Sequence, residues 1–102
     1  MTVEGTWKLS VDSPVGEQEA RLVLRRDGDR LTGSLDHDKA SLEVVDGVVD
    51  GDVASWKVVK AITVVVKVRV TATFTVTVEG DRMRGRVAAG KFGTFDVTGL
   101  RV

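Results

Sequence analysis

The stretch that decides the fold is Trp56–Glu79, WKVVKAITVVVKVRVTATFTVTVE, which is rich in Val and Thr and contains no Gly, Pro, Asn or Asp. This composition is typical of β-strand rather than helix. From Lys67 onward, apolar residues at even positions alternate with Lys, Arg and Thr at odd positions. One face is therefore predicted to be buried and the other exposed.

The length of this stretch predicts that it reverses direction. A single strand of this length would reach about 80 Å at roughly 3.3 Å per residue, whereas a domain of about 100 residues has a radius of gyration near 13 Å. Odd and even positions are both largely apolar between Val58 and Val66, so a turn without the usual turn residues is expected there. The stretch is predicted to form two strands.

The overall composition bounds the size and the partners of the protein. With 102 residues, the chain is expected to form one domain, 1–102, around one core. Fifteen basic and fifteen acidic residues cancel, and neither sign is clustered in a tail. This charge pattern argues against nucleic acid and against an anionic membrane as partners.

The absence of cysteine excludes disulfides, a thiolate nucleophile and cysteine metal ligands. Small secreted domains commonly carry disulfides, so we expect a cytoplasmic protein. The first ten residues, MTVEGTWKLS, have neither the basic nor the apolar region of a secretory leader, and no stretch is apolar enough on both parities to span a bilayer. We expect a soluble chain without a leader.

Turn residues divide the rest of the chain into short alternating runs. Outside the decisive stretch, the predicted strands are 3–12, a run through 20–25, a run through 31–37, 40–45 with a turn at Asp46-Gly47, 82–88 and 94–102, and Gly51-Asp52 starts the fifth strand. This makes eight strands and no segment with helical periodicity. We expect an antiparallel up-and-down β-barrel, because closure removes both sheet edges. A two-sheet sandwich is the alternative.

The two halves of the chain resemble each other, which predicts a four-strand unit used twice. Gly5–Leu9 matches Ala54–Val58, and Ala20–Gly33 matches Ala72–Gly85, including a shared Gly-Asp-Arg at the hairpin. In the first copy, the turn after the Trp strand comes at Ser13–Gly16. The second copy is slightly longer, so its turn is expected near 62–66.

The two ends of the chain carry a family resemblance. Gly5-Thr6-Trp7 and Gly99-Leu100-Arg101 resemble the calycin pattern of lipocalins, fatty-acid-binding proteins and avidins. The resemblance implies that Arg101 covers Trp7 and closes one barrel end, and such a stacked pair contributes about 0.5–2 kcal/mol.

A second resemblance covers most of the chain. The order GTWKLSVDSPVGEQ, DGDRLTGSL, DGVVDGDVASW, EGDRMRGRV and FGTFDVTGLR is similar to small barrel domains found alone or appended to amidohydrolase-like proteins, which have no well-defined shared activity. The segment 57–70, KVVKAITVVVKVRV, departs from the Pro-containing turn of those domains. A redesigned segment in this region would explain the departure.

The barrel topology predicts one closed end and one open end. Alternate turns of a meander lie at opposite ends, so the turns at 13–16, 37–39, 62–66 and 89–92 are expected to share the end away from Trp7 and Arg101. An eight-stranded barrel either fills itself with side chains or holds one small ligand. Small inward residues at Gly33, Ala72 and Gly85 are expected to leave room near the middle.

The predicted function is the binding of a small hydrophobic or aromatic ligand inside this barrel, with no cofactor. The expected lining residues are Leu22, Leu35, His37, Trp56, Val58, Ala72, Phe74, Met83 and Phe95. Trp56 either lines the cavity or is only the second copy of the core Trp.

Two other functions stay open, an isomerase-like or cyclase-like enzyme and a structural module without ligand. His37 is the single histidine, and Tyr, Cys and Asn are absent, so catalytic groups are few. His37 is either an idle residue at a hairpin tip or a mouth residue, oriented by Asp36 or Asp38, that bonds a ligand or moves a proton. Lys60 either reaches solvent or serves as a reactive amine. A metal site is not expected, because consecutive strand residues point to opposite faces.

The decisive stretch also predicts self-association. The odd positions of this stretch are polar from Lys67 onward, but before Lys67 they include the apolar residues Val59, Ala61 and Val65. Burying one Val side chain is worth about 1.5–3 kcal/mol. We expect a homodimer, or a higher symmetric oligomer, through the 58–66 region. The alternative is a hairpin that folds over its own barrel mouth as a lid.

Overall fold

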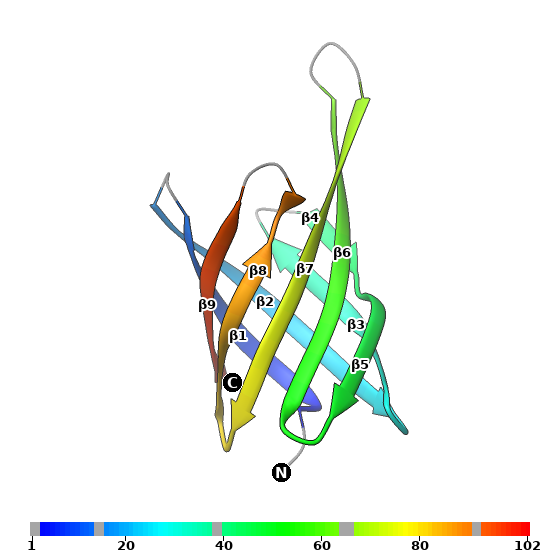
Figure 1. Ribbon diagram of the computed structural model, residues 1–102, viewed down its shortest axis with the longest axis vertical. Coiled ribbons are helices and arrows are strands. Elements are labelled where there is room, and N and C mark those ends of the chain that lie inside the picture. Colours follow the sequence, from blue (N-terminus) through cyan, green and yellow to red (C-terminus); the bar gives the residue numbers. More distant parts are fainter. Residues whose placement is uncertain (1–2, 14–15, 38–39, 64–66, 91–92) are drawn as a thin grey trace.

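The computed structural model describes residues 3–13, 16–37, 40–63, 67–90 and 93–102 (Figure 1). These residues form nine β-strands: β1 (Gly5–Ser13), β2 (Gly16–Asp27), β3 (Arg30–His37), β4 (Ala40–Glu43), β5 (Val45–Asp50), β6 (Val53–Thr63), β7 (Lys67–Glu79), β8 (Arg82–Ala88) and β9 (Thr94–Arg101). No helix in this part of the chain is long and apolar enough to cross a membrane.

Eight of these strands close into an antiparallel barrel. The strand order is β2-β1-β9-β8-β7-β6-β5-β3, and pairing of β2 with β3 closes the ring. β4 pairs with β3 and lies outside the ring. The predicted eight-stranded up-and-down barrel is confirmed, and the two-sheet sandwich is wrong.

The fourth predicted strand differs from the observed one. The sequence predicted a strand over 40–45 and a turn at Asp46-Gly47, but the chain forms β4, then β5, and turns at Gly51-Asp52. Asp46 has a φ of 52°, and the register of β5 on β6 shifts between Val45 and Val48. The Asp-Gly pair therefore makes a bulge inside a strand, which uses the same residue types as a turn.

The decisive stretch reverses as predicted, since β6 and β7 pair up to Thr63 opposite Lys67. Residues 64–66, on which the predicted turn was centred, lie outside the described residues. β5 pairs with β6 only up to Lys57, and β8 pairs with β7 only from Thr73. The upper part of the β6–β7 hairpin therefore projects beyond both neighbours, along the longest dimension of 45 Å (Figure 1).

The inward faces of the strands share one core. Its buried members are Val3, Trp7, Leu9, Leu22, Leu24, Leu31, Leu35, Val44, Val49, Ala54, Trp56, Val58, Phe74, Val76, Val78, Met83, Val87 and Val97. Matching residues of the two halves occupy matching register positions. Trp7 pairs with Leu22 in the first half, and Trp56 pairs with Phe74 in the second. In the next strand pair of each half, Gly33 and Gly85 lie opposite apolar residues.

Candidate functional site

One end of the barrel is closed by Trp7 and Arg101, as the resemblance implied. Trp7 is fully buried, and its Nε1 donates a hydrogen bond to the carbonyl oxygen of Val3 at 2.8 Å. The guanidinium carbon of Arg101 lies 4.2 Å from the centroid of the indole ring. This end, called the Trp7 end below, is therefore sealed by a stacked cation–π pair.

The glycine of the Gly5-Thr6-Trp7 motif has a structural reason in this arrangement. The guanidinium of Arg101 is held by the carbonyl oxygen of Glu4 at 2.6 Å and by the carboxylate of Asp81 at 3.1 Å. A Cβ at Gly5 would lie 2.7 Å from Arg101 Nη1, and Gly5 has a φ of 134°. Glycine thus makes room for the arginine that covers the tryptophan.

The opposite end, called the His37 end, leaves inward apolar side chains partly exposed. The C-terminal ends of β1, β3, β6 and β8 lie at this end, away from both chain termini (Figure 1). The partly buried apolar residues that pack against the core are Val11, Ala20, Leu42, Ala72 and Phe95. Val11 and Ala20 belong to the upper parts of β1 and β2, and Phe95 is the second residue of β9. Solvent therefore reaches core-facing apolar surface from the His37 end.

The nine residues predicted to line a site all belong to the inward parity of their strands. Leu22, Leu35, Trp56, Val58, Phe74 and Met83 are buried, and His37, Ala72 and Phe95 are half-buried. Met83 does not lie with the others. It pairs with Gly99 near the Trp7 end, where its side chain and that of Leu9 fill the space that a Cβ on Gly99 would need.

Four of the inward residues form a continuous row across β6, β7, β8 and β9. Trp56 pairs with Phe74, Phe74 with Val87, and Val87 with Phe95. The rings of Trp56 and Phe74 stack with centroids 5.3 Å apart and an interplanar angle of 9°. The row begins at a fully buried Trp and ends at a half-buried Phe, so it leads from the core to the His37 end.

The indole N–H of Trp56 is buried and has no hydrogen-bond partner among the described residues. Trp56 itself is 1% exposed, so its indole N–H lies away from the outer surface of the barrel. Buried donors are nearly always paired in proteins, and each exception calls for a physical explanation. No sequence signal could have found this atom, because the pairing of Trp7 and the isolation of Trp56 depend on which nearby carbonyl groups are free.

The room expected at two of the small inward residues is absent. A Cβ at Gly33 would collide with the carbonyl oxygen of Val23, and one at Gly85 would collide with that of Thr75. Backbone of the neighbouring strand fills both places, so the glycines allow close strand approach rather than a cavity. The prediction is wrong for these two residues, while Ala72 is half-buried beside the His37 end.

His37 is the last residue of β3 and is half-buried. Its Nδ1 lies 3.0 Å from the carbonyl oxygen of Glu19. A carbonyl can only accept, so Nδ1 carries the proton and Nε2 of the neutral ring is an acceptor. The described partner of Nδ1 is thus a backbone carbonyl, and Asp38, one of the two carboxylates predicted to orient the ring, lies outside the described residues.

The other proposed catalytic and metal groups are only partly placed. Lys60 pairs with Val70 on the inward parity of β6, but its side chain lies outside the described part of the structure. Asp38 lies outside the described residues altogether. Among the residues that the structure does describe, no three His, Asp or Glu side chains gather to hold a metal ion.

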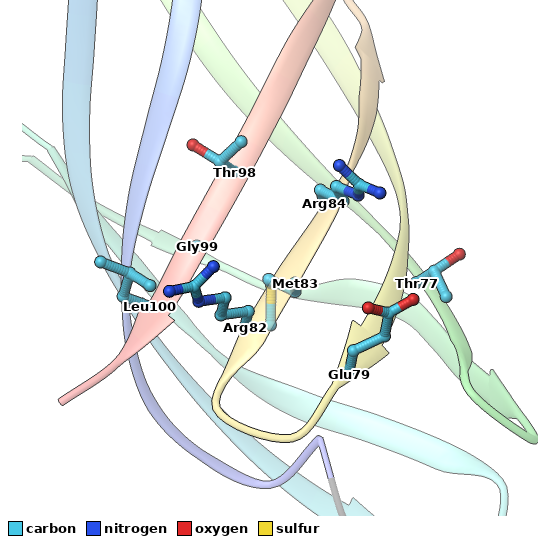
Figure 2. Close-up of a pocket in the computed structure, with 8 residues that line it drawn as sticks. All are labelled: Thr77, Glu79, Arg82, Met83, Arg84, Thr98, Gly99 and Leu100. Carbon is cyan, nitrogen blue, oxygen red and sulfur yellow. The ribbon is translucent and has the colours of Figure 1, made fainter.

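A shallow depression of about 490 Å³ lies on the outer face of β7, β8 and β9 (Figure 2). It is lined by Thr77, Glu79, Arg82, Met83, Arg84, Thr98, Gly99 and Leu100. Most of these side chains are exposed and polar, and Figure 2 shows them spread over the strands rather than converging on one point. It is open to solvent and does not coincide with the His37 end.

No known protein family matches this chain, and no curated protein matches it either. The class of protein is therefore defined by the fold alone, as an all-β protein with a closed, eight-stranded antiparallel barrel and one strand outside the ring.

Proposed function

We propose that the protein binds a small hydrophobic or aromatic molecule in the half of the barrel next to the His37 end. The observation that carries this proposal is the contrast between the two ends. The Trp7 end is sealed by a buried indole under a guanidinium, whereas core-facing side chains of Val11, Ala20 and Phe95 are accessible at the other. Accessible apolar surface on a preformed scaffold favours an apolar guest.

The finer family assignment is part of this proposal. The stacked pair of Trp7 and Arg101 supports a calycin-like barrel, because the same N-terminal Trp and C-terminal basic residue carry the resemblance in sequence. Calycins include lipocalins and avidins, so the assignment agrees with a ligand inside the barrel. It adds nothing about the identity of that ligand.

A homodimer is proposed through the 58–66 region of the projecting hairpin. Strand residues 58–63 have no partner on the β5 side, and 67–72 have none on the β8 side. Exposed valines lie on the adjoining outer face, with Val59 at 42% and Val48 at 50%. Unpaired strand edges next to exposed apolar side chains favour pairing with a second copy.

The binding proposal is tested by native mass spectrometry of the protein as purified from cells. We expect a mass excess that disappears after unfolding and refolding, together with uptake of an apolar fluorescent probe by the refolded protein. A bare mass with no probe uptake would instead support the structural module.

The enzyme alternative rests on His37, whose Nε2 accepts hydrogen bonds in the neutral ring. If it serves only as a rim residue, His37→Ala leaves probe affinity nearly unchanged and abolishes no reaction. A reaction whose rate collapses in His37→Ala while probe affinity stays constant would replace binding by catalysis as the function.

A further inference from the structure

We propose that the indole N–H of Trp56 is the donor that anchors the ligand, and that the ligand is a planar, uncharged molecule with a hydrogen-bond acceptor such as a carbonyl or ether oxygen. This inference rests on the proposed binding function and deepens it. Its starting point is the buried Nε1 of Trp56, which has no acceptor within the part of the chain that the structure describes. A buried donor without a partner is costly, so an acceptor from outside the chain gains this bond on binding.

The first tryptophan shows how the same fold satisfies an indole when it is purely structural. Trp7 Nε1 donates to the carbonyl oxygen of Val3, four residues earlier in the chain. The residue four positions before Trp56 is Asp52, and its carbonyl oxygen accepts from the backbone N–H of Val78 at 2.8 Å. In the second half of the barrel this carbonyl oxygen is bonded to a backbone N–H of β7, and the indole N–H of Trp56 has no acceptor among the described residues.

The row of residues beside Trp56 indicates the shape of the ligand. Trp56 stacks on Phe74, and the row continues through Val87 to the half-buried Phe95 at the His37 end. Trp56, Phe74 and Val87 are buried, so a flat apolar body reaches this aromatic wall only when side chains next to Phe95 move to admit it, and its acceptor then faces the indole N–H. Aromatic rings favour offset or edge contacts with such a body.

The charge of the interior indicates that the acceptor is neutral. Among the described residues, none that is polar or charged is buried. Beside Trp56, a carboxylate or phosphate would therefore lose its hydration without gaining a counter-charge from any described residue, whereas a carbonyl or ether oxygen loses much less. One neutral hydrogen bond then gives orientation rather than most of the affinity.

The test compares indane with 1-indanone, which share a bicyclic skeleton and differ by one carbonyl group. Wild-type protein and Trp56→Phe are titrated with both, and Trp7→Phe serves as the matched indole control. We expect wild type to prefer 1-indanone, and in Trp56→Phe the ratio of 1-indanone affinity to indane affinity should fall about five- to tenfold, because both probes lose the same apolar contact and only 1-indanone loses a hydrogen bond. Both variants should melt lower than wild type, because each shrinks a buried side chain, and Trp7→Phe should melt lower than Trp56→Phe, because it also removes the hydrogen bond to the Val3 carbonyl oxygen.

The ¹H–¹⁵N resonances of the two indoles provide a direct readout. 1-Indanone should move the Trp56 resonance downfield and slow its hydrogen exchange, while the Trp7 resonance stays in place. If wild type and Trp56→Phe showed the same ratio of 1-indanone affinity to indane affinity, the inference would be overturned and the binding function would still stand. A Trp56 N–H that contacts only water in the presence of bound 1-indanone would also overturn it. Failure of wild type to bind either probe or any other apolar probe would overturn both proposals.

Discussion

Two tryptophans occupy matching register positions in this barrel but meet different surroundings. The indole of Trp7 has a backbone acceptor and a guanidinium over its face, and that of Trp56 has a stacked Phe74 and no acceptor. The sequence predicted both as inward residues, because parity alone decides which face a strand residue belongs to. It could not predict their hydrogen bonds, because these depend on where the carbonyl groups of other segments lie around each indole.

The sealed end predicts a graded loss of stability. Trp7→Ala should lower the free energy of unfolding by about 3–5 kcal/mol, because it removes a fully buried large side chain. Arg101→Ala should cost less, about 0.5–2 kcal/mol, since it removes the stacked cation while the indole remains. Urea unfolding measures both, with the exposed neighbour Lys8→Ala as control. An unchanged midpoint for Trp7→Ala would show that this end is not sealed.

Gly85 provides a test of where the barrel has no space. A Cβ at this position would meet the carbonyl oxygen of Thr75, so Gly85→Ala should destabilise the fold by about 1–3 kcal/mol through overpacking. Arg84→Ala, on the exposed face of the same strand, should change stability little. Thermal unfolding measures the stability of both variants. A Gly85→Ala variant with the melting temperature of wild type would show that there is space beside Gly85.

At the scale of elements, the alternation of apolar and polar residues predicted most strands and the reversal between Thr63 and Lys67. The stretch 40–50 was misread, because Asp46-Gly47 carries the residue types of a hairpin turn but forms a bulge in β5. Turns and bulges both place a residue at positive φ, and only pairing with β6 distinguishes them. Local sequence therefore could not settle which of the two forms.

The projecting hairpin predicts a dimer that depends on its exposed valines. Wild type should sediment as a dimer at micromolar concentration, and Val45→Lys/Val59→Lys should sediment as a monomer, because two exposed apolar contacts become like charges. Val102→Lys, at the exposed C-terminus, is the matched control and should remain dimeric. A monomeric wild type would exclude the dimer and leave the hairpin as the proposed lid over the His37 end.

At the scale of the whole molecule, closure of the sheet follows from the number and spacing of the strands, which the sequence shows. Whether the interior is filled or accessible does not follow, because it depends on how residues from distant strands meet. Gly33 and Gly85 seemed to leave space but are filled by backbone, while Val11 and Phe95 are accessible only because no described side chain covers them. The residues predicted to line a site do face inward, but the sequence did not separate Met83 at the Trp7 end from the others.

Uptake of an apolar fluorescent probe by two variants of β7 tests the central claim most directly. Ala72 and Thr71 are neighbours on opposite faces, Ala72 packed against the core near the His37 end and Thr71 exposed outside. Ala72→Glu places a charge on the inward surface and should reduce probe affinity at least tenfold, whereas Thr71→Glu should bind the probe as wild type does. Equal affinity of the two variants, with both folded, would contradict binding inside the barrel.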